Sequence, residues 1–165
     1  MAALTIPLDS MSGARLWWFG EWSAERGDTL MLAAIAQRLK QLATNPAERV
    51  PARAMAARML VLRGDTTAAI DSLLVLRPVA LLPDLVWNYW DALAPERLLL
   101  AQLLLARGRP AEADAVARSF DGQRTAVDVA FLPASLELRR KAAAMMENRD
   151  LAEIYRRRLV ALSRR

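Results

Sequence analysis

The sequence of 165 residues contains no cysteine and no histidine. The absence of cysteine excludes disulfide bonds, thiolate nucleophiles, iron–sulfur clusters and zinc–thiolate sites. The absence of histidine removes the commonest general base and the commonest metal ligand. Only six glycines are present, which leaves little room for a glycine-rich phosphate loop. The composition argues against most enzyme chemistries, and we expect a chain with no catalytic residue, metal or cofactor.

Long uncharged apolar runs are also missing. No stretch reaches the roughly 18 apolar residues that suggest a membrane-spanning helix. The first ten residues lack the basic start of a secretory signal peptide. We therefore expect no transmembrane segment and a cytoplasmic location.

The charged side chains are distributed unevenly. The formal net charge is +5 at pH 7, and a hydrophobic fraction of 55% is compatible with a folded globular protein. Residues 1–132 carry equal numbers of basic and acidic side chains, whereas residues 133–165 carry nine basic and four acidic ones. The last fifth of the chain is therefore a candidate for contact with an acidic protein or with nucleic acid phosphates.

A short turn motif recurs along the chain. It reads Arg-Gly-Asp at 26–28 and 63–65, Arg-Gly-Arg at 107–109, and Asn-Arg-Asp in a degenerate copy at 148–150. The middle residues are separated by 37, 44 and 41 positions. Glycine suits the left-handed residue that ends a helix, and the aspartate after it can cap the next helix. Each copy therefore predicts a tight turn between two helices.

Apolar residues flank these turns at helical spacings. The stripe before the second turn contains Ala52, Met55, Ala56, Met59 and Leu60. The sequence thus predicts an all-α fold, an α-solenoid of about four antiparallel helical hairpins. The predicted parts are a tail over 1–12 and one domain over 13–163, with hairpins at about 13–43, 47–77, 94–120 and 133–163.

Prolines and connectors complete the predicted organisation. Pro46, Pro95 and Pro133 each stand where a helix is expected to begin, a position that tolerates the missing N–H group. Two longer connectors are expected over 78–93 and 121–132.

Small residues at fixed distances from each turn give the sequence a family resemblance. One position lies in the helix before each turn, at a constant distance from the middle residue of the turn, and it holds Gly20, Ala57, Ala101 and Ala142 in the four hairpins. The corresponding position in the helix after each turn holds Leu32, Ala69, Ala113 and Ile154. Helices that cross closely need small side chains at such points. The pattern resembles tetratricopeptide repeats, with a good match in two hairpins.

A second resemblance covers the end of the chain. Residues 95–162 are similar to the C-terminal helical repeats of large bacterial signalling proteins, namely Ser/Thr kinases and transcription regulators. The stretches at 96–101 and 132–136 carry this resemblance, and no kinase motif accompanies them. The resemblance implies a docking or sensor part, without catalysis, in bacterial signalling or assembly.

The tetratricopeptide resemblance implies a protein or peptide partner bound in a concave groove lined by the first helix of each hairpin. The residues that it places there are Trp17, Glu21, Arg58, Leu98, Gln102 and Arg139. Arginine and glutamine side chains can hold a carboxylate or a peptide backbone. Secondary candidates are Trp87 and Trp90 in the first connector and Arg156, Arg157 and Arg158 in the last hairpin.

Three alternatives remain open. Trp17, Trp18 and Trp22 lie close together in the first hairpin, and exposed tryptophans there would favour a homodimer. The arginine-rich last hairpin would suit a nucleic-acid-binding protein. The chain would also fit a structural subunit of a larger complex, in which the tryptophan cluster is buried permanently.

Overall fold

The structure is a computed structural model that describes residues 7–44, 49–76, 93–122 and 126–163, apart from the side chain of Val127. Within these ranges the regular structure is entirely helical, so the all-α prediction is confirmed. The elements are η1 (Leu8–Ser10), α1 (Gly13–Glu25), α2 (Thr29–Leu42), α3 (Val50–Leu62), α4 (Thr66–Leu74), α5 (Ala94–Ala106), α6 (Pro110–Ala117), η3 (Arg118–Gly122), α7 (Ala126–Met145) and α8 (Arg149–Leu162).

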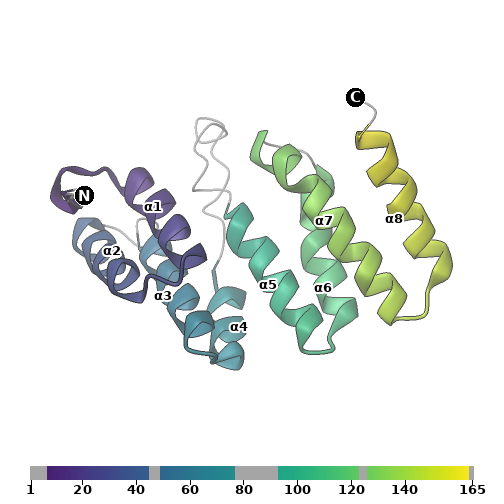
Figure 1. Ribbon diagram of the computed structural model, residues 1–165, viewed down its shortest axis with the longest axis horizontal. Coiled ribbons are helices and arrows are strands. Elements are labelled where there is room, and N and C mark those ends of the chain that lie inside the picture. The colour runs from purple at the N-terminus through teal and green to yellow at the C-terminus, as the bar shows by residue number, and fades with distance from the viewer. Residues whose placement is uncertain (1–6, 45–48, 77–92, 123–125, 164–165) are drawn as a thin grey trace. The chain divides into compact units, whose positions relative to one another are not determined.

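The chain divides into two compact units, residues 1–77 and residues 78–165. The N-terminal unit contains α1 to α4, and the C-terminal unit contains α5 to α8. In each unit, helices that follow one another in sequence pack as antiparallel neighbours (Figure 1). The solenoid that would join all four hairpins in one domain stays a prediction.

The predicted turns are present. Positive φ angles of 69°, 80° and 70° occur at Gly27, Gly64 and Gly108. At the first turn, the N–H of Gly27 donates to the carbonyl of Ala24, and the N–H of Asp28 donates to that of Ser23. These paired bonds form a Schellman motif, which satisfies carbonyls at the end of α1. The side chain of Asp28 then accepts from the N–H of Met31 and caps α2.

The fourth turn lies two residues earlier than predicted. Glu147 takes the left-handed conformation, with φ of 57°, and the Asn148 side chain caps α8. Arg149, predicted at the turn, is the first residue of α8. The tripeptide comparison aligned the wrong residues because Asn148 is itself a good N-cap and fixes where the helix begins. When Glu147 is taken as the turn residue, the two positions that are small in other hairpins hold Arg140 and Ala152 in this hairpin, instead of Ala142 and Ile154.

α7 also begins earlier than predicted. It runs over Ala126–Met145 with Pro133 inside, although we expected Pro133 at its start. Proline removes one backbone hydrogen bond from a helix, and packing of the added turns offsets this loss. Phe131 stacks on Phe120, with 6.2 Å between ring centroids. Part of the predicted connector over 121–132 is therefore helix.

Small residues do lie where helices approach closely. Ala57, Ala69, Ala101 and Ala113 are fully buried. A Cβ atom added to Gly20 would collide with the sulfur of Met55 and crowd Ile35. The small side chains at these positions thus permit the close helix packing that the sequence predicted.

Candidate partner-binding grooves

An open groove lies between α2 and α3 in the N-terminal unit. Its volume is about 850 Å³. Small or apolar side chains make most of its lining: Ala33, Ala36, Ala43, Ala52, Ala56, Met59 and Leu60. Ala33 and Ala56 are exposed. A groove with such a lining can bury apolar side chains of a partner.

Four cations line the same groove. They are Lys40 on α2, Arg49 just before α3, Arg53 within it and Arg63 just after it. In the described part of the chain, none of the four side chains has an ion pair or hydrogen bond. The described lining residues include no aspartate or glutamate. The described lining therefore presents four cations that form no ion pair with a described carboxylate, and positive charge of this kind favours acidic groups.

This groove was not predicted from the sequence. The stripe that contains Ala52, Ala56 and Leu60 predicts a helix, but only Met55 of that stripe is buried. A basic residue precedes the stripe at Arg49 and another interrupts it at Arg53. Basic residues at helical spacing beside exposed alanines were the signal that pointed to this surface.

A second, smaller groove lies between α5 and α7 in the C-terminal unit. Its volume is about 420 Å³, and it includes the predicted contact Gln102, which is exposed. Glu137 and Lys141 also line it, so its charge is mixed. Leu98, also predicted to line a concave face, is half-buried and packs against the core of the unit. The structure thus places Gln102, but not Leu98, in this groove.

Glu21 and Arg58, two predicted partner contacts, bind each other inside the N-terminal unit. The Arg58 guanidinium donates two hydrogen bonds to the Glu21 carboxylate. The side chains of Glu21 and Arg58 are only 9% and 13% exposed. Trp17, the third predicted contact of this unit, is fully buried. The structure therefore gives these residues contacts within the unit, and their contact with a partner stays a prediction.

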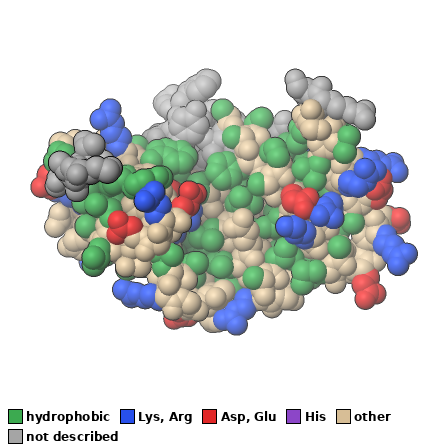
Figure 2. All heavy atoms as spheres, in the orientation of Figure 1, with side chains coloured by type: hydrophobic (Ala, Val, Ile, Leu, Met, Phe, Trp, Pro, Cys, Tyr) green, Lys and Arg blue, Asp and Glu red, His purple; other side chains and the backbone are tan. Residues whose placement is uncertain are grey.

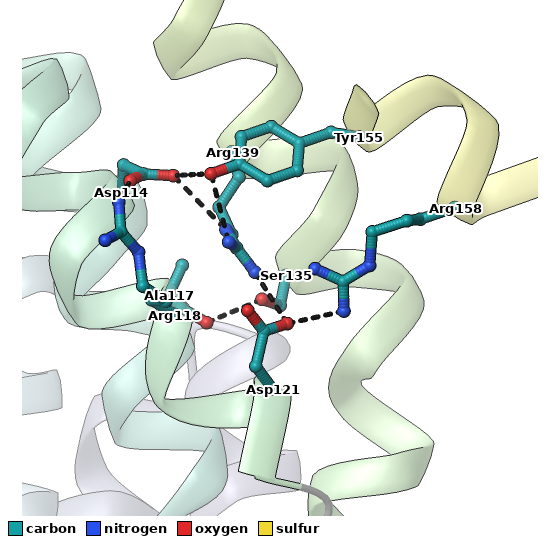
Figure 3. A network of polar contacts seen from close by, with 8 residues as sticks. All are labelled: Asp114, Ala117, Arg118, Asp121, Ser135, Arg139, Tyr155 and Arg158. Atoms are coloured by element: carbon teal, nitrogen blue, oxygen red, sulfur yellow. Dashed lines mark hydrogen bonds and ion pairs between the residues drawn. The ribbon is translucent and has the colours of Figure 1, made fainter. Parts of the chain in front are cut away.

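Arg139 lies at the centre of a polar network in the C-terminal unit (Figure 3). Its guanidinium donates to Asp121 at 2.8 Å and to the Tyr155 hydroxyl at 3.0 Å. Tyr155 in turn donates to Asp114 at 2.8 Å, and Arg158 donates to Asp121 at 2.6 Å. The network joins η3 with α6, α7 and α8 (Figure 3). Arg139 is only 3% exposed, so it holds these helices together from inside.

Hydrogen bonds keep the carboxylates of this network charged. Burial by itself raises the pKa of Asp114, but hydrogen bonds from two guanidinium groups and the Tyr155 hydroxyl outweigh it and hold the pKa below its ordinary value. The same balance lowers the pKa of Asp121, which accepts from Arg158 and Arg139. Burial and the hydrogen bond to Asp114 raise the pKa of Tyr155. These protonation states suit a fixed structural link between helices.

The arginines proposed for nucleic-acid contact are also paired. Arg156 and Arg157 donate to Glu153 at 2.6 Å and 2.9 Å, and their hydrogen bonds lower the pKa of Glu153 to about 2. Arg158 belongs to the network described above. Acidic and basic side chains lie next to one another over the C-terminal unit on the face that Figure 2 shows. The carboxylates partly neutralise the positive charge that the sequence concentrates here.

The tryptophan cluster is divided between core and surface. Trp18 and Trp22 are 44% and 49% exposed, whereas Trp17 is buried. Trp22 stacks on Phe19, with 5.4 Å between ring centroids, and Arg26 lies over its ring at 4.8 Å. Two large aromatic side chains thus remain half-exposed on α1. Trp87 and Trp90 lie outside the described residues.

No family model, curated protein or solved structure matches this chain. The resemblances to tetratricopeptide repeats and to bacterial signalling proteins therefore stay predictions. None of the helices in the described ranges combines the length and the apolar character needed to cross a membrane.

Proposed function

We propose that this chain is a non-catalytic interaction module that binds a protein or peptide partner in grooves between its helices. The observation that carries the proposal is the open groove between α2 and α3, with its mostly apolar lining and four cations that have no ion pair among the described residues. The groove between α5 and α7 is a second surface of the same kind. A cytoplasmic role in bacterial signalling or assembly is part of the proposal and rests on the sequence resemblances.

Preformed grooves are the mechanism that we propose. The helices that line each groove are held by buried side chains and by turns of one recurring geometry. A rigid binding surface loses little conformational entropy when a partner binds, so more of the contact energy appears as affinity.

The test is affinity capture from nuclease-treated lysate with groove-blocking variants. Ala33→Trp fills the α2/α3 groove, and Ala134→Trp fills the α5/α7 groove. Their controls are Ala34→Trp and Ala144→Trp, at exposed alanines on the same helices but outside the grooves. We expect at least one blocked variant to lose a protein that the wild type and its control both capture. Equal capture by all four variants, or capture of no protein, would contradict the proposal.

Self-association is a second candidate, favoured by the half-exposed Trp18 and Trp22. Sedimentation velocity over a dilution series measures it directly. A homodimer through α1 predicts a concentration-dependent shift that Trp18→Gln with Trp22→Gln abolishes. A wild-type chain that stays monomeric at high concentration rules the homodimer out.

A further inference from the structure

We propose that the groove between α2 and α3 docks an acidic amphipathic helix of a partner protein. This inference rests on the proposed function and adds the site and the chemistry of the partner. Three observations carry it: cations at the groove that pair with no described carboxylate, the mostly apolar lining, and the spacing of the lining residues along two helices.

The charge of the groove selects an acidic partner. Lys40, Arg49, Arg53 and Arg63 line it, and none of them forms an ion pair with a described carboxylate. A cation that is already paired must release its carboxylate before it binds the carboxylate of a partner. These four side chains, which have no described ion pair, need to release only bound water. Complementary charges also steer a partner to the site and reject basic competitors.

The shape of the groove fits a helix. Its lining residues run from 33 to 43 on or just after α2 and from 49 to 63 on or beside α3, which corresponds to about 15 Å and about 21 Å of helix axis. They recur at spacings of three and four, the spacing with which one helix packs against another. A partner helix of about 10 to 14 residues matches this length.

The lining disfavours other partners. An extended peptide needs hydrogen-bond partners for its backbone, and Gln37 is the one uncharged polar side chain among the described lining residues. A helix satisfies its backbone internally and needs only apolar and ionic contacts. Single-stranded nucleic acid gains much of its affinity by stacking on aromatic rings, and the described lining has no aromatic residue. An acidic helix with apolar residues on one face can contact both the apolar lining residues and the cations.

The experiment is an unbiased selection with the full-length chain. A displayed library of helix-favouring peptides about 14 residues long, with randomised surface positions, is selected for binding to the wild type. Affinities of the recovered peptides are then measured by fluorescence anisotropy at low and at high salt. We expect peptides rich in Asp and Glu, with apolar residues three and four apart. We also expect their binding to weaken with salt, because the contacts are ionic.

Matched variants locate the site. Ala33→Trp blocks the groove, and Ala34→Trp is its control on the exposed surface of the same helix. Arg53→Glu with Arg63→Glu reverses two groove charges. Arg15→Glu with Arg149→Glu makes the same change in net charge at exposed arginines outside the groove. We expect the blocked and the groove-reversed variants to bind at least about tenfold more weakly, and both controls to bind like the wild type.

The outcomes separate this inference from the proposed function. Acidic helical peptides that lose affinity in Ala33→Trp support it. Recovered peptides without acidic enrichment, or peptides blocked by Ala134→Trp alone, overturn it and leave a protein-binding module in place. Binding of a single-stranded oligonucleotide, measured in the same anisotropy assay, overturns it in favour of nucleic acid if it is stronger than that of the peptides and is lost in Ala33→Trp. If no peptide is recovered, the inference of an acidic helical partner is overturned. If the lysate capture also yields no protein, the proposed function is overturned too.

Discussion

The two units contain similar helical hairpins but differ in how their basic residues are used. In the C-terminal unit, ion pairs involve Arg97, Arg109, Arg118, Arg139, Arg140, Lys141, Arg156, Arg157 and Arg158. In the N-terminal unit, Lys40, Arg49, Arg53 and Arg63 gather at one groove without a described ionic partner. The unit with the larger basic excess in sequence is therefore the one whose charges are more fully paired.

Net charge alone therefore does not indicate which basic side chains are available to a partner. Ion pairs such as those of the buried Arg139 with Asp114 and Asp121 fix the positions of helices. Unpaired surface cations remain available to a ligand. Removal of a buried partner should thus reduce stability, whereas removal of a groove cation should reduce binding and leave the fold intact.

The largest effect is expected from breaking the buried network. Asp114→Ala leaves Arg139 and Tyr155 without their shared acceptor, and losing one partner of a buried ion pair costs about 3–5 kcal/mol. Urea unfolding measures the change in the free energy of unfolding. Asp71→Ala, at an exposed aspartate on α4, is the control and should change it by less than about 0.5 kcal/mol. Equal effects would show that the network contributes no special stability.

A smaller loss is expected in the N-terminal unit, where apolar close packing dominates. Gly20→Val places side-chain atoms where Met55 and Ile35 already lie, and overpacking costs about 1–3 kcal/mol. The same urea assay measures it, with Ala34→Val on exposed surface as the control. A variant as stable as the wild type would mean that α1 and α3 can separate freely at this point.

Acid should destabilise the C-terminal unit. The pKa values of Asp114 and Asp121 are lower in the folded chain than their ordinary values. The stability that these two carboxylates contribute to the folded state is therefore fully present above the ordinary aspartate pKa of about 4. It is lost as the pH falls through their pKa values in the folded chain. Hydrogen exchange followed by mass spectrometry should show α6 and α8 losing protection below about pH 4. Asp114→Asn should reduce this pH dependence, and an unchanged profile would contradict the assignment.

The smallest effect is expected at an exposed ion pair. Glu153 binds Arg156 and Arg157 on the surface of α8, and solvent screens such pairs strongly. Glu153→Gln should leave the melting temperature nearly unchanged. A loss comparable to that of Asp114→Ala would remove the distinction between buried and exposed pairs.

Local rules predicted much of the fold. The glycine turns and the capping aspartates were predicted because each depends on only a few neighbouring residues. Pro133 was misplaced because packing of Phe131 against Phe120, distant in sequence, extends α7. The sites were harder to predict. Trp17, Glu21 and Arg139 have the residue types of binding contacts, but whether such side chains point inward depends on tertiary packing that spacing alone does not reveal.

We have proposed that the cations that bind a partner lie in the groove between α2 and α3. Two charge-matched variants test this in affinity capture, Lys40→Gln with Arg53→Gln and Arg156→Gln with Arg157→Gln. Each removes two positive charges. We expect the first variant to lose the captured partner and the second to retain it. Loss of the partner by the second variant alone would contradict the proposal and place binding on the arginine-rich last hairpin.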